Sequence, residues 1–307
     1  MQFFFTCLIR VLITSNLLGL AHAAAGQIVD GHFHIFSPKN SQKIDDEMIK
    51  GPVSGEDAVN LLTSAGVEKA IVLSAAYLFQ SYEDAKYEND YVEREAYSQE
   101  GRFIPFCSVR LGASWALEEV ERCLTKGSMK GLKLHPVANS LDLADEESWK
   151  VLESIINRVN QLQSQLHRTF PVIIDSNWQN RKITLKFVHL SAKFPKLKFI
   201  LAHALSFDRM DLEIIGFYYQ ALPHLPRNIY VDLSAIIVFY EGSPDNDKFL
   251  WVLDKFGVDR VLFGSDYPVF SPQTALASLR TYKFRPHDLQ GILGLNALRL
   301  WDNEGAF

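Results

Sequence analysis

The chain alternates short runs of β-forming residues with longer stretches of helical periodicity. Most of the runs are continuously apolar, as expected for parallel strands covered on both faces. They read QIVDGHFHI, KAIVLSA, RFIPFCSVR, KGLKLH, FPVIIDS, LKFILAHA, NIYVDLSA and RVLFGSD. Eight such units predict a single (β/α)8 barrel of the TIM type over residues 24–307. A doubly wound open sheet is the alternative, but the sequence lacks the glycine-rich phosphate loop typical of that fold.

Helical periodicity is clear in EDAVNLLTSAG and EESWKVLESIINRVNQLQSQL, and residues 284–301 predict a last amphipathic helix that closes the domain. The 307 residues are 48% hydrophobic with a formal net charge of -5, an ordinary globular composition. Because no block of Lys and Arg occurs, nucleic acid is not expected as the main partner.

The first 23 residues resemble a secretory signal peptide. VLITSNLLGL would be its apolar core and Ala21-His22-Ala23 its cleavage site. Arg10 interrupts the apolar stretch, which disfavours a spanning helix of about 20 apolar residues. We therefore expect cleavage near Ala23, export to the periplasm or the outside of the cell, and no stable membrane anchor.

The three cysteines do not form a disulfide framework. Cys7 would leave with the signal peptide, while Cys107 lies in a strand-like run and Cys123 in a helix-like one. A disulfide between the last two and burial as two free thiols both remain open.

Histidines gather at the carboxyl ends of the expected strands, where (β/α)8 barrels carry their chemistry. His32 and His34 stand two residues apart on one strand and therefore share a face. His135 and His203 follow the fourth and sixth strands. The other histidines fall in the leader, before strands or within helical segments: His22, His167, His189, His224 and His287. Four imidazoles at one rim favour a functional site, although a single one would favour a structural role.

Carboxylates occupy the same strand ends. Asp175 ends FPVIID, Asp232 lies within IYVDLSA, and Asp266 ends VLFGSD. Asp266 would project into the barrel mouth and can bind a metal or accept a proton. Its alternative, a cap for the next helix, is weakened by Pro268 and the long approach to that helix.

Several motifs in order carry a resemblance that covers residues 27–302. They are VDGHFH, KGLKLHP, KFPKLKFILAHA, IYVDLS, VLFGSDYP and GILGLNALRL. In these motifs the chain resembles the amidohydrolase superfamily, specifically its amidohydrolase-related group of metal-dependent hydrolases and decarboxylases.

The resemblance implies a metal site. His32 and His34 match the first-strand ligands, and Asp266 matches the eighth-strand aspartate that touches the metal and shuttles a proton. His203 matches the sixth-strand histidine, which polarises the substrate or binds a second metal. One divalent ion is implied, with zinc as the first candidate and manganese or iron as alternatives.

The fourth-strand motif supplies Lys133 and His135 as substrate-binding candidates. Lys133 can hold a substrate carboxylate, or become carboxylated and bridge two metals as in some relatives. A salt bridge inside the barrel is an almost equal alternative for this lysine.

One position departs from the family pattern. The fifth strand ordinarily ends in a metal-binding histidine, and here it ends in Asp175. A carboxylate is also a competent ligand, so we expect Asp175 to replace the histidine, with a metal or Lys133 as its partner. A lost metal site, acid–base work or no chemical role are the alternatives.

The function favoured at this point is metal-dependent hydrolysis of an amide, ester or lactone of a small organic acid through an activated water. Decarboxylation of an aromatic or unsaturated acid is the first alternative, and the export sequence favours hydrolysis over it. A secreted, non-catalytic barrel without metal is the second. Aromatic residues in the loops can line an organic-acid pocket or pack within those loops: Phe36, Tyr77, Phe79 and Tyr82. A homo-oligomer is compatible with the sequence.

Overall fold

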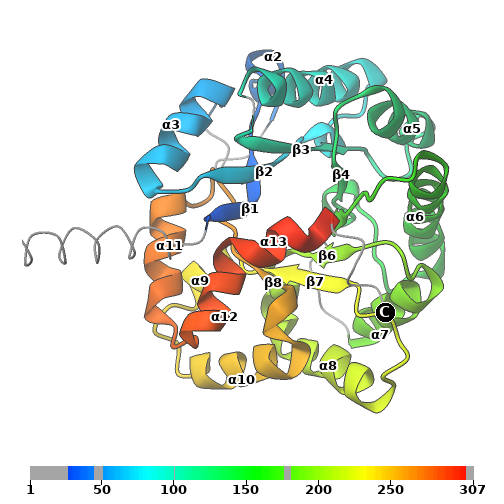
Figure 1. Cartoon of the computed structure of the whole chain (residues 1–307). Coiled ribbons are helices and arrows are strands. Elements are labelled where there is room, and N and C mark those ends of the chain that lie inside the picture. The colour runs from blue at the N-terminus through cyan, green and yellow to red at the C-terminus, as the bar shows by residue number, and fades with distance from the viewer. Residues whose placement is uncertain (1–26, 45–50, 100, 176–180, 302–307) are drawn as a thin grey trace, which may run out of the picture.

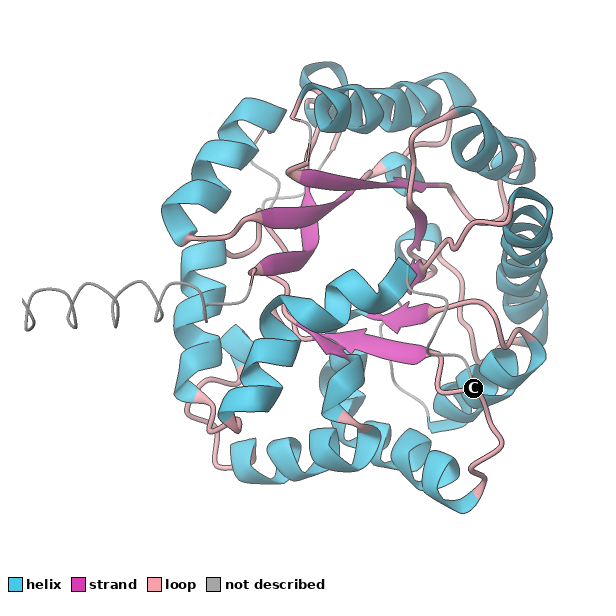
Figure 2. Ribbon diagram, viewed as in Figure 1, coloured by secondary structure: helices cyan, strands magenta, loops and turns pink. Residues whose placement is uncertain are grey.

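A computed structural model describes residues 27–44, 51–99, 101–175 and 181–301, and it shows a ring of parallel strands surrounded by helices (Figures 1 and 2). The predicted signal peptide lies outside the described residues. The eight strands pair in chain order within one sheet. They are β1 (Val29–His34), β2 (Lys69–Leu73), β3 (Phe103–Ser108), β4 (Gly131–Leu134), β5 (Val172–Ile174), β6 (Phe199–Leu201), β7 (Ile229–Asp232) and β8 (Val261–Leu262).

The segment after β8 returns to β1 and completes the ring. The Gly31 amide donates to the Phe263 carbonyl at 2.8 Å, and the His34 amide donates to the Tyr267 carbonyl at 3.0 Å. A Cβ at Gly31 would lie 2.7 Å from the Phe263 oxygen, so only glycine permits this approach. The predicted (β/α)8 barrel is thereby confirmed.

Each strand leads into a helix on the outside of the ring (Figure 2). The helices are α2 (Pro38–Ser41), α3 (Gly55–Ala65), α4 (Tyr82–Ser98), α5 (Ala116–Lys126), α6 (Glu146–Leu166), α7 (Arg181–Lys193), α8 (Leu212–Ala221), α9 (Ile236–Phe239), α10 (Asn246–Phe256), α11 (Pro272–Thr281), α12 (Pro286–Gln290) and α13 (Asn296–Leu298). None of the helices in these described parts of the chain is long and apolar enough to cross a membrane.

Helix α6 matches the predicted span because its ends carry local stop signals. The Asp145 side chain accepts a hydrogen bond from the Ser148 amide, which satisfies a free donor of the first turn. His167 ends the helix in a left-handed conformation with φ of 52°.

The C-terminal segment is one continuous helical run, as predicted. It contains a π-helical turn (Gly291–Leu295) between α12 and α13. Asn296 donates from its side-chain amide to the Val258 and Val261 carbonyls, both at 2.8 Å. A Cβ at Gly294 would lie 1.8 Å from the Gln27 carbonyl oxygen. Tight packing under the strands therefore shapes this segment, which lies across one end of the barrel (Figure 1).

Two hydrophobic clusters divide the strand residues by face. The cluster inside the barrel includes Ile173 and Ile200 together with Ala297 and Leu300 of the C-terminal segment. The C-terminal segment therefore plugs the end at which the strands begin, and the histidine and aspartate side chains that follow the strands lie at the opposite end. The cluster between strands and helices takes the alternate positions of each strand, such as Val172.

Cys107 and Cys123 are both buried and free. The structure therefore has two buried thiols and no disulfide between these two residues.

Candidate metal centre

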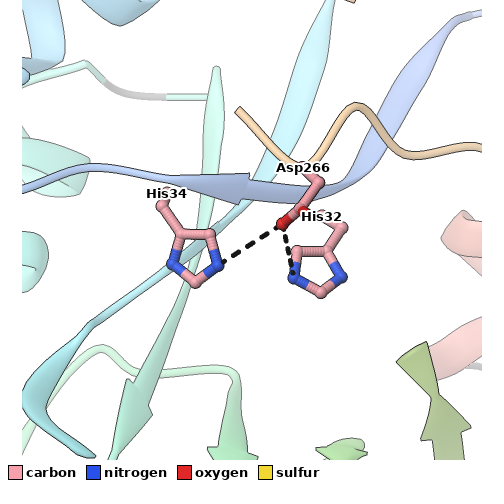
Figure 3. A group of neighbouring side chains, drawn as sticks. All are labelled: His32, His34 and Asp266. Atoms are coloured by element: carbon pink, nitrogen blue, oxygen red, sulfur yellow. Dashed lines mark ion pairs between the residues drawn. The ribbon is translucent and has the colours of Figure 1, made fainter. Parts of the chain in front are cut away.

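His32, His34 and Asp266 converge at the mouth of the barrel, where the strands end (Figure 3). The Asp266 Oδ1 atom lies 3.4 Å from His32 Nε2 and 3.9 Å from His34 Nε2. Each ring turns one nitrogen toward the carboxylate, and all three ligand atoms lie within 4.8 Å of one another. We call these residues the triad.

The neighbours of His32 orient its ring. Nδ1 lies 3.0 Å from the Asp232 carboxylate, which can only accept, so Nδ1 carries a hydrogen. Nε2 faces the Lys133 ammonium at 3.2 Å and the Asp266 carboxylate at 3.4 Å, so a lone pair on Nε2 would point into the triad. A neutral imidazole oriented by a carboxylate behind it is the usual form of a histidine metal ligand.

The triad fits a divalent ion. Two ligands bound to zinc at about 2.0–2.1 Å in tetrahedral geometry stand roughly 3.4 Å apart, close to the His32–Asp266 separation. Two imidazoles and one carboxylate are also a common donor set, and three protein ligands leave a coordination position open. The pKa of His34 is held well below its usual range by burial and by His32 and Lys133, which keeps its ring neutral.

A second group, made of His32, His203 and Asp232, is also close enough to hold an ion. The Asp232 carboxylate, however, already accepts from the His32 ring, from the amides of His203 and Ser234 at 3.1 Å each, and from the Ser234 hydroxyl. Although burial opposes its charge, His32 lowers the pKa of Asp232 to about 2. Asp232 therefore serves as an orienting anion, and the triad is the better centre.

His203 lies beside His32 with its ring centroid 4.9 Å away, but its hydrogen bonds differ. Nδ1 faces the Ser234 carbonyl at 3.0 Å, and Nε2 faces the Asp175 carboxylate at 3.3 Å. Two acceptors require two N–H groups, so His203 is an imidazolium. Burial opposes this charge, but Asp175, Asp266 and Asp232 outweigh it and raise the pKa to about 10.

Asp175 gathers donors around one oxygen. Its Oδ2 lies 3.0 Å from Lys133 Nζ, 3.3 Å from His203 Nε2 and 3.5 Å from His135 Nε2. Burial would raise the pKa of Asp175, but these neighbours hold it well below its usual range. Lys133 is thus a partner of Asp175, one of the two partners expected from the sequence. Among the described residues Asp175 belongs to neither group that can hold an ion.

His135 joins Asp175 as a neutral donor. Its Nδ1 accepts from the Ala138 amide at 3.2 Å, so Nε2 carries the hydrogen that points to Asp175. Burial lowers the pKa of His135 to about 4, which agrees with a neutral ring. We call Lys133, His135 and His203 the donor group.

The family model of the amidohydrolases matches residues 29–302. The chain belongs to the amidohydrolase family. The resemblance inferred from the sequence motifs is therefore confirmed.

Solved structures show the same fold at low sequence identity. A 2,6-dihydroxybenzoate decarboxylase from Rhizobium is 18% identical with a TM-score of 0.65, over 90% of this chain and 98% of its own. A dihydroxybenzoic acid decarboxylase from Polaromonas, with bound manganese and the inhibitor 2-nitroresorcinol, is 16% identical with a TM-score of 0.63, over 90% of this chain and 96% of its own. A probable 2-pyrone-4,6-dicarboxylic acid hydrolase from Acinetobacter baumannii is 14% identical with a TM-score of 0.60, over 89% of this chain and 98% of its own. No curated protein sequence matches the chain.

Exposure in this amidohydrolase shows which side of the site is open. The side chains of His32 and Lys133 are fully buried, whereas Asp266 is 15% exposed and His135 is 19% exposed. A molecule that enters the mouth therefore meets Asp266, His135 and the 13% exposed His203 first.

Two backbone features of the amidohydrolase bring histidines inward. The register of β1 against β2 shifts between Asp30 and Phe33, so Val29 faces the barrel interior and Phe33 the outer core. Residues 203–206 then adopt φ values of 47° to 65°, rare for residues other than glycine, and turn His203 toward the mouth. Simple alternation along the strands predicts neither feature.

The sequence motifs of the amidohydrolase contain two supporting residues for which no role was predicted. Asp30 accepts from the His32 amide at 3.1 Å and the Ser265 amide at 3.0 Å, and thereby links β1 to the segment after β8. Burial raises its pKa to about 7. Ser234 contacts both Asp232 and His203. Asp30 lies inside the quoted VDGHFH motif and Ser234 inside IYVDLS, so their positions were visible although their partners were not.

The predicted aromatic residues divide into two pairs. Phe36 stacks on His34 at 5.8 Å between centroids, and Tyr77 packs on His135 at 4.9 Å. Phe79 is buried in a small separate cluster, and Tyr82 packs against Trp115. Only the first pair adjoins the site of the amidohydrolase.

Proposed function

We propose that this chain is a metal-dependent decarboxylase of a small aromatic or unsaturated carboxylic acid. The observation that carries the proposal is His203, an imidazolium held beside the triad with acceptors at both nitrogens. Decarboxylation needs a proton donor for carbon, whereas hydrolysis first needs a base. Several solved structures of the same fold are aromatic acid decarboxylases, which supports this choice.

In this proposal His32, His34 and Asp266 hold one divalent ion. Zinc is the first candidate, and manganese, present in one structural relative, is the main alternative. Bound there, such an ion supplies Lewis acidity toward the oxygen atoms of the substrate.

In this proposal, different residues of the chain orient the substrate and transfer the proton. The Lys133 ammonium, held by Asp175, orients the carboxylate of the substrate, and the partly exposed His135 lines the mouth beside it. His203 gives the proton of Nε2 to the carbon that bears the carboxylate. The bond between that carbon and the carboxylate breaks, its electron pair stays with the organic fragment, and neutral carbon dioxide leaves. His203 regains a proton from the open side of the mouth.

Hydrolysis is the second candidate, and it was the function favoured from the sequence. The partly exposed Asp266 can serve as the base that hydrolysis needs, and hydrolases of a pyrone dicarboxylate share the fold. Both candidates use the same triad.

One assay separates the two reactions. The full chain is stripped with a chelator and reloaded with zinc or manganese. Carbon dioxide release from hydroxybenzoates and unsaturated acids is then compared with proton release from lactones and esters and with amine release from amides. Carbon dioxide release that depends on the added ion is expected. Turnover of lactones, esters or amides without carbon dioxide release would replace the proposal with hydrolysis, and no turnover by the loaded protein on either panel would contradict both.

Export also remains a proposal, supported by the first 23 residues. Mass spectrometry of the mature N-terminus tests it. Cleavage near Ala23 is expected, whereas an intact Met1 on cytosolic protein would contradict it.

A further inference from the structure

Asp175 stands at the position where the family pattern has a metal-binding histidine, yet its surroundings do not suit a ligand. Oδ2 faces three N–H donors from three different residues at 3.0 to 3.5 Å. Two of these donors, the Lys133 ammonium and the His203 imidazolium, carry positive charge. A divalent ion bound to the same oxygen would have to displace at least one cation and would be repelled by the other.

The triad has the opposite character. Its ligand atoms are two imidazole nitrogens and a carboxylate oxygen, and among the described residues the side-chain ammonium that reaches them is that of Lys133, 3.2 Å from His32 Nε2. Asp175 holds that same ammonium from the other side at 3.0 Å. Lys133 therefore separates the Asp175 carboxylate from the triad.

We propose that Asp175 is not a metal ligand but a positioning counter-ion, which holds the donor group together at the edge of the triad. Its effect on a substrate carboxylate rests on the proposed function, whereas its role as counter-ion does not. Without it, Lys133 and His203 would remain as two buried cations that repel each other, and breaking such buried pairs is strongly destabilising.

This role predicts chemical rescue. Replacing Asp175 by alanine leaves a space lined by the three N–H donors of Lys133, His135 and His203. Formate carries the same carboxylate group without the rest of the side chain, so it can fill that space. A missing metal ligand would give a different result, because it would be compensated by a new ligand such as histidine.

The experiment uses the full chain and two measurements that need no substrate. Zinc and manganese affinities are measured by equilibrium dialysis for the wild type and for Asp175→Ala, Asp175→Asn and Asp175→His. The melting temperature is measured for the same proteins as formate is added. The matched control is Asp84→Ala, because Asp84 also accepts from two lysines, Lys39 at 3.3 Å and Lys43 at 2.6 Å, but at the surface.

If Asp175 is the counter-ion, Asp175→Ala and Asp175→Asn bind the ion within about 100-fold of the wild type, since changes outside the ligand set typically cost about 10–100-fold. Formate raises the melting temperature of Asp175→Ala by about 2–4 °C and saturates, as a bound ligand does. The wild type and Asp84→Ala do not respond. An Asp175→Ala chain that folds only with formate gives the same support.

Two results would overturn the inference. Loss of the ion in both Asp175→Ala and Asp175→Asn, with retention in Asp175→His, would make Asp175 a ligand. Equal formate responses in Asp175→Ala and Asp84→Ala would remove the counter-ion role. Neither result depends on carbon dioxide release, so failure of the proposed decarboxylation is recognised separately.

Discussion

The two sides of the barrel mouth contain the same kind of residue in different surroundings. On the side of β1 and β8, His32 Nε2 meets both the Lys133 ammonium and the Asp266 carboxylate. On the side of β5 and β6, His203 is an imidazolium because a carboxylate meets its Nε2. The two rings lie only 4.9 Å apart, and Asp232 accepts from the His32 ring and from the His203 backbone amide. The partners of the ring nitrogens, not the residue type, favour one histidine as a metal ligand and the other as a proton donor.

Each side of the mouth also has its own carboxylate. Negative Asp266 belongs to the triad, and negative Asp175 belongs to the donor group. Lys133 touches both sides. A substitution can therefore disturb one side of the mouth and leave the other side in place.

The triad is tested most directly by His34→Ala. This change removes one of three ligand atoms, so zinc affinity should fall by more than about 100-fold, beyond the range expected for residues outside the ligand set. Equilibrium dialysis measures it. His287→Ala is the matched control, because His287 has a side chain that is 97% exposed. Equal affinities for the two variants would remove His34 from the metal centre.

Asp232→Asn tests the residue shared by both sides. The amide keeps the shape but loses the charge that holds a hydrogen on His32 Nδ1, so metal affinity should fall by about 10–100-fold. Metal affinity and turnover should both decline, because the His203 amide also bonds to this carboxylate. Metal affinity within twofold of the wild type would mean that Asp232 does not orient His32.

Lys133→Met should act in the opposite direction on the metal. The ammonium competes for the lone pair of His32 Nε2 and repels a cation, so its removal should tighten zinc binding by about 10-fold. Without zinc the variant should be less stable, by up to about 3–5 kcal/mol, because Asp175 loses its closest partner. Dialysis and urea unfolding with and without zinc measure both effects. Weaker zinc binding would instead make Lys133 part of the metal centre, as a carboxylated lysine would be.

Much of the fold followed from hydrophobic patterning. Each of the eight observed strands lies within a predicted run, because strands buried on both faces must be continuously apolar. The C-terminal helix was also predicted, but not its π-helical turn, which lies beside carbonyls of distant residues that accept from Asn296. Periodicity reports the buried face of a segment but not the shape of the surface it meets.

For the site, residue types and strand-end positions were sufficient to name His32, His34, Asp266 and His203 as candidates. The sequence also identified Asp175 as the departure from the family pattern. It left open which charges these residues carry and which of them meet. Protonation depends on the group that faces each nitrogen or oxygen, and those groups are far away in the chain, 200 positions for His32 and Asp232. Closing the barrel brings them within hydrogen-bond distance, so the chemical state of each residue follows from the folded structure.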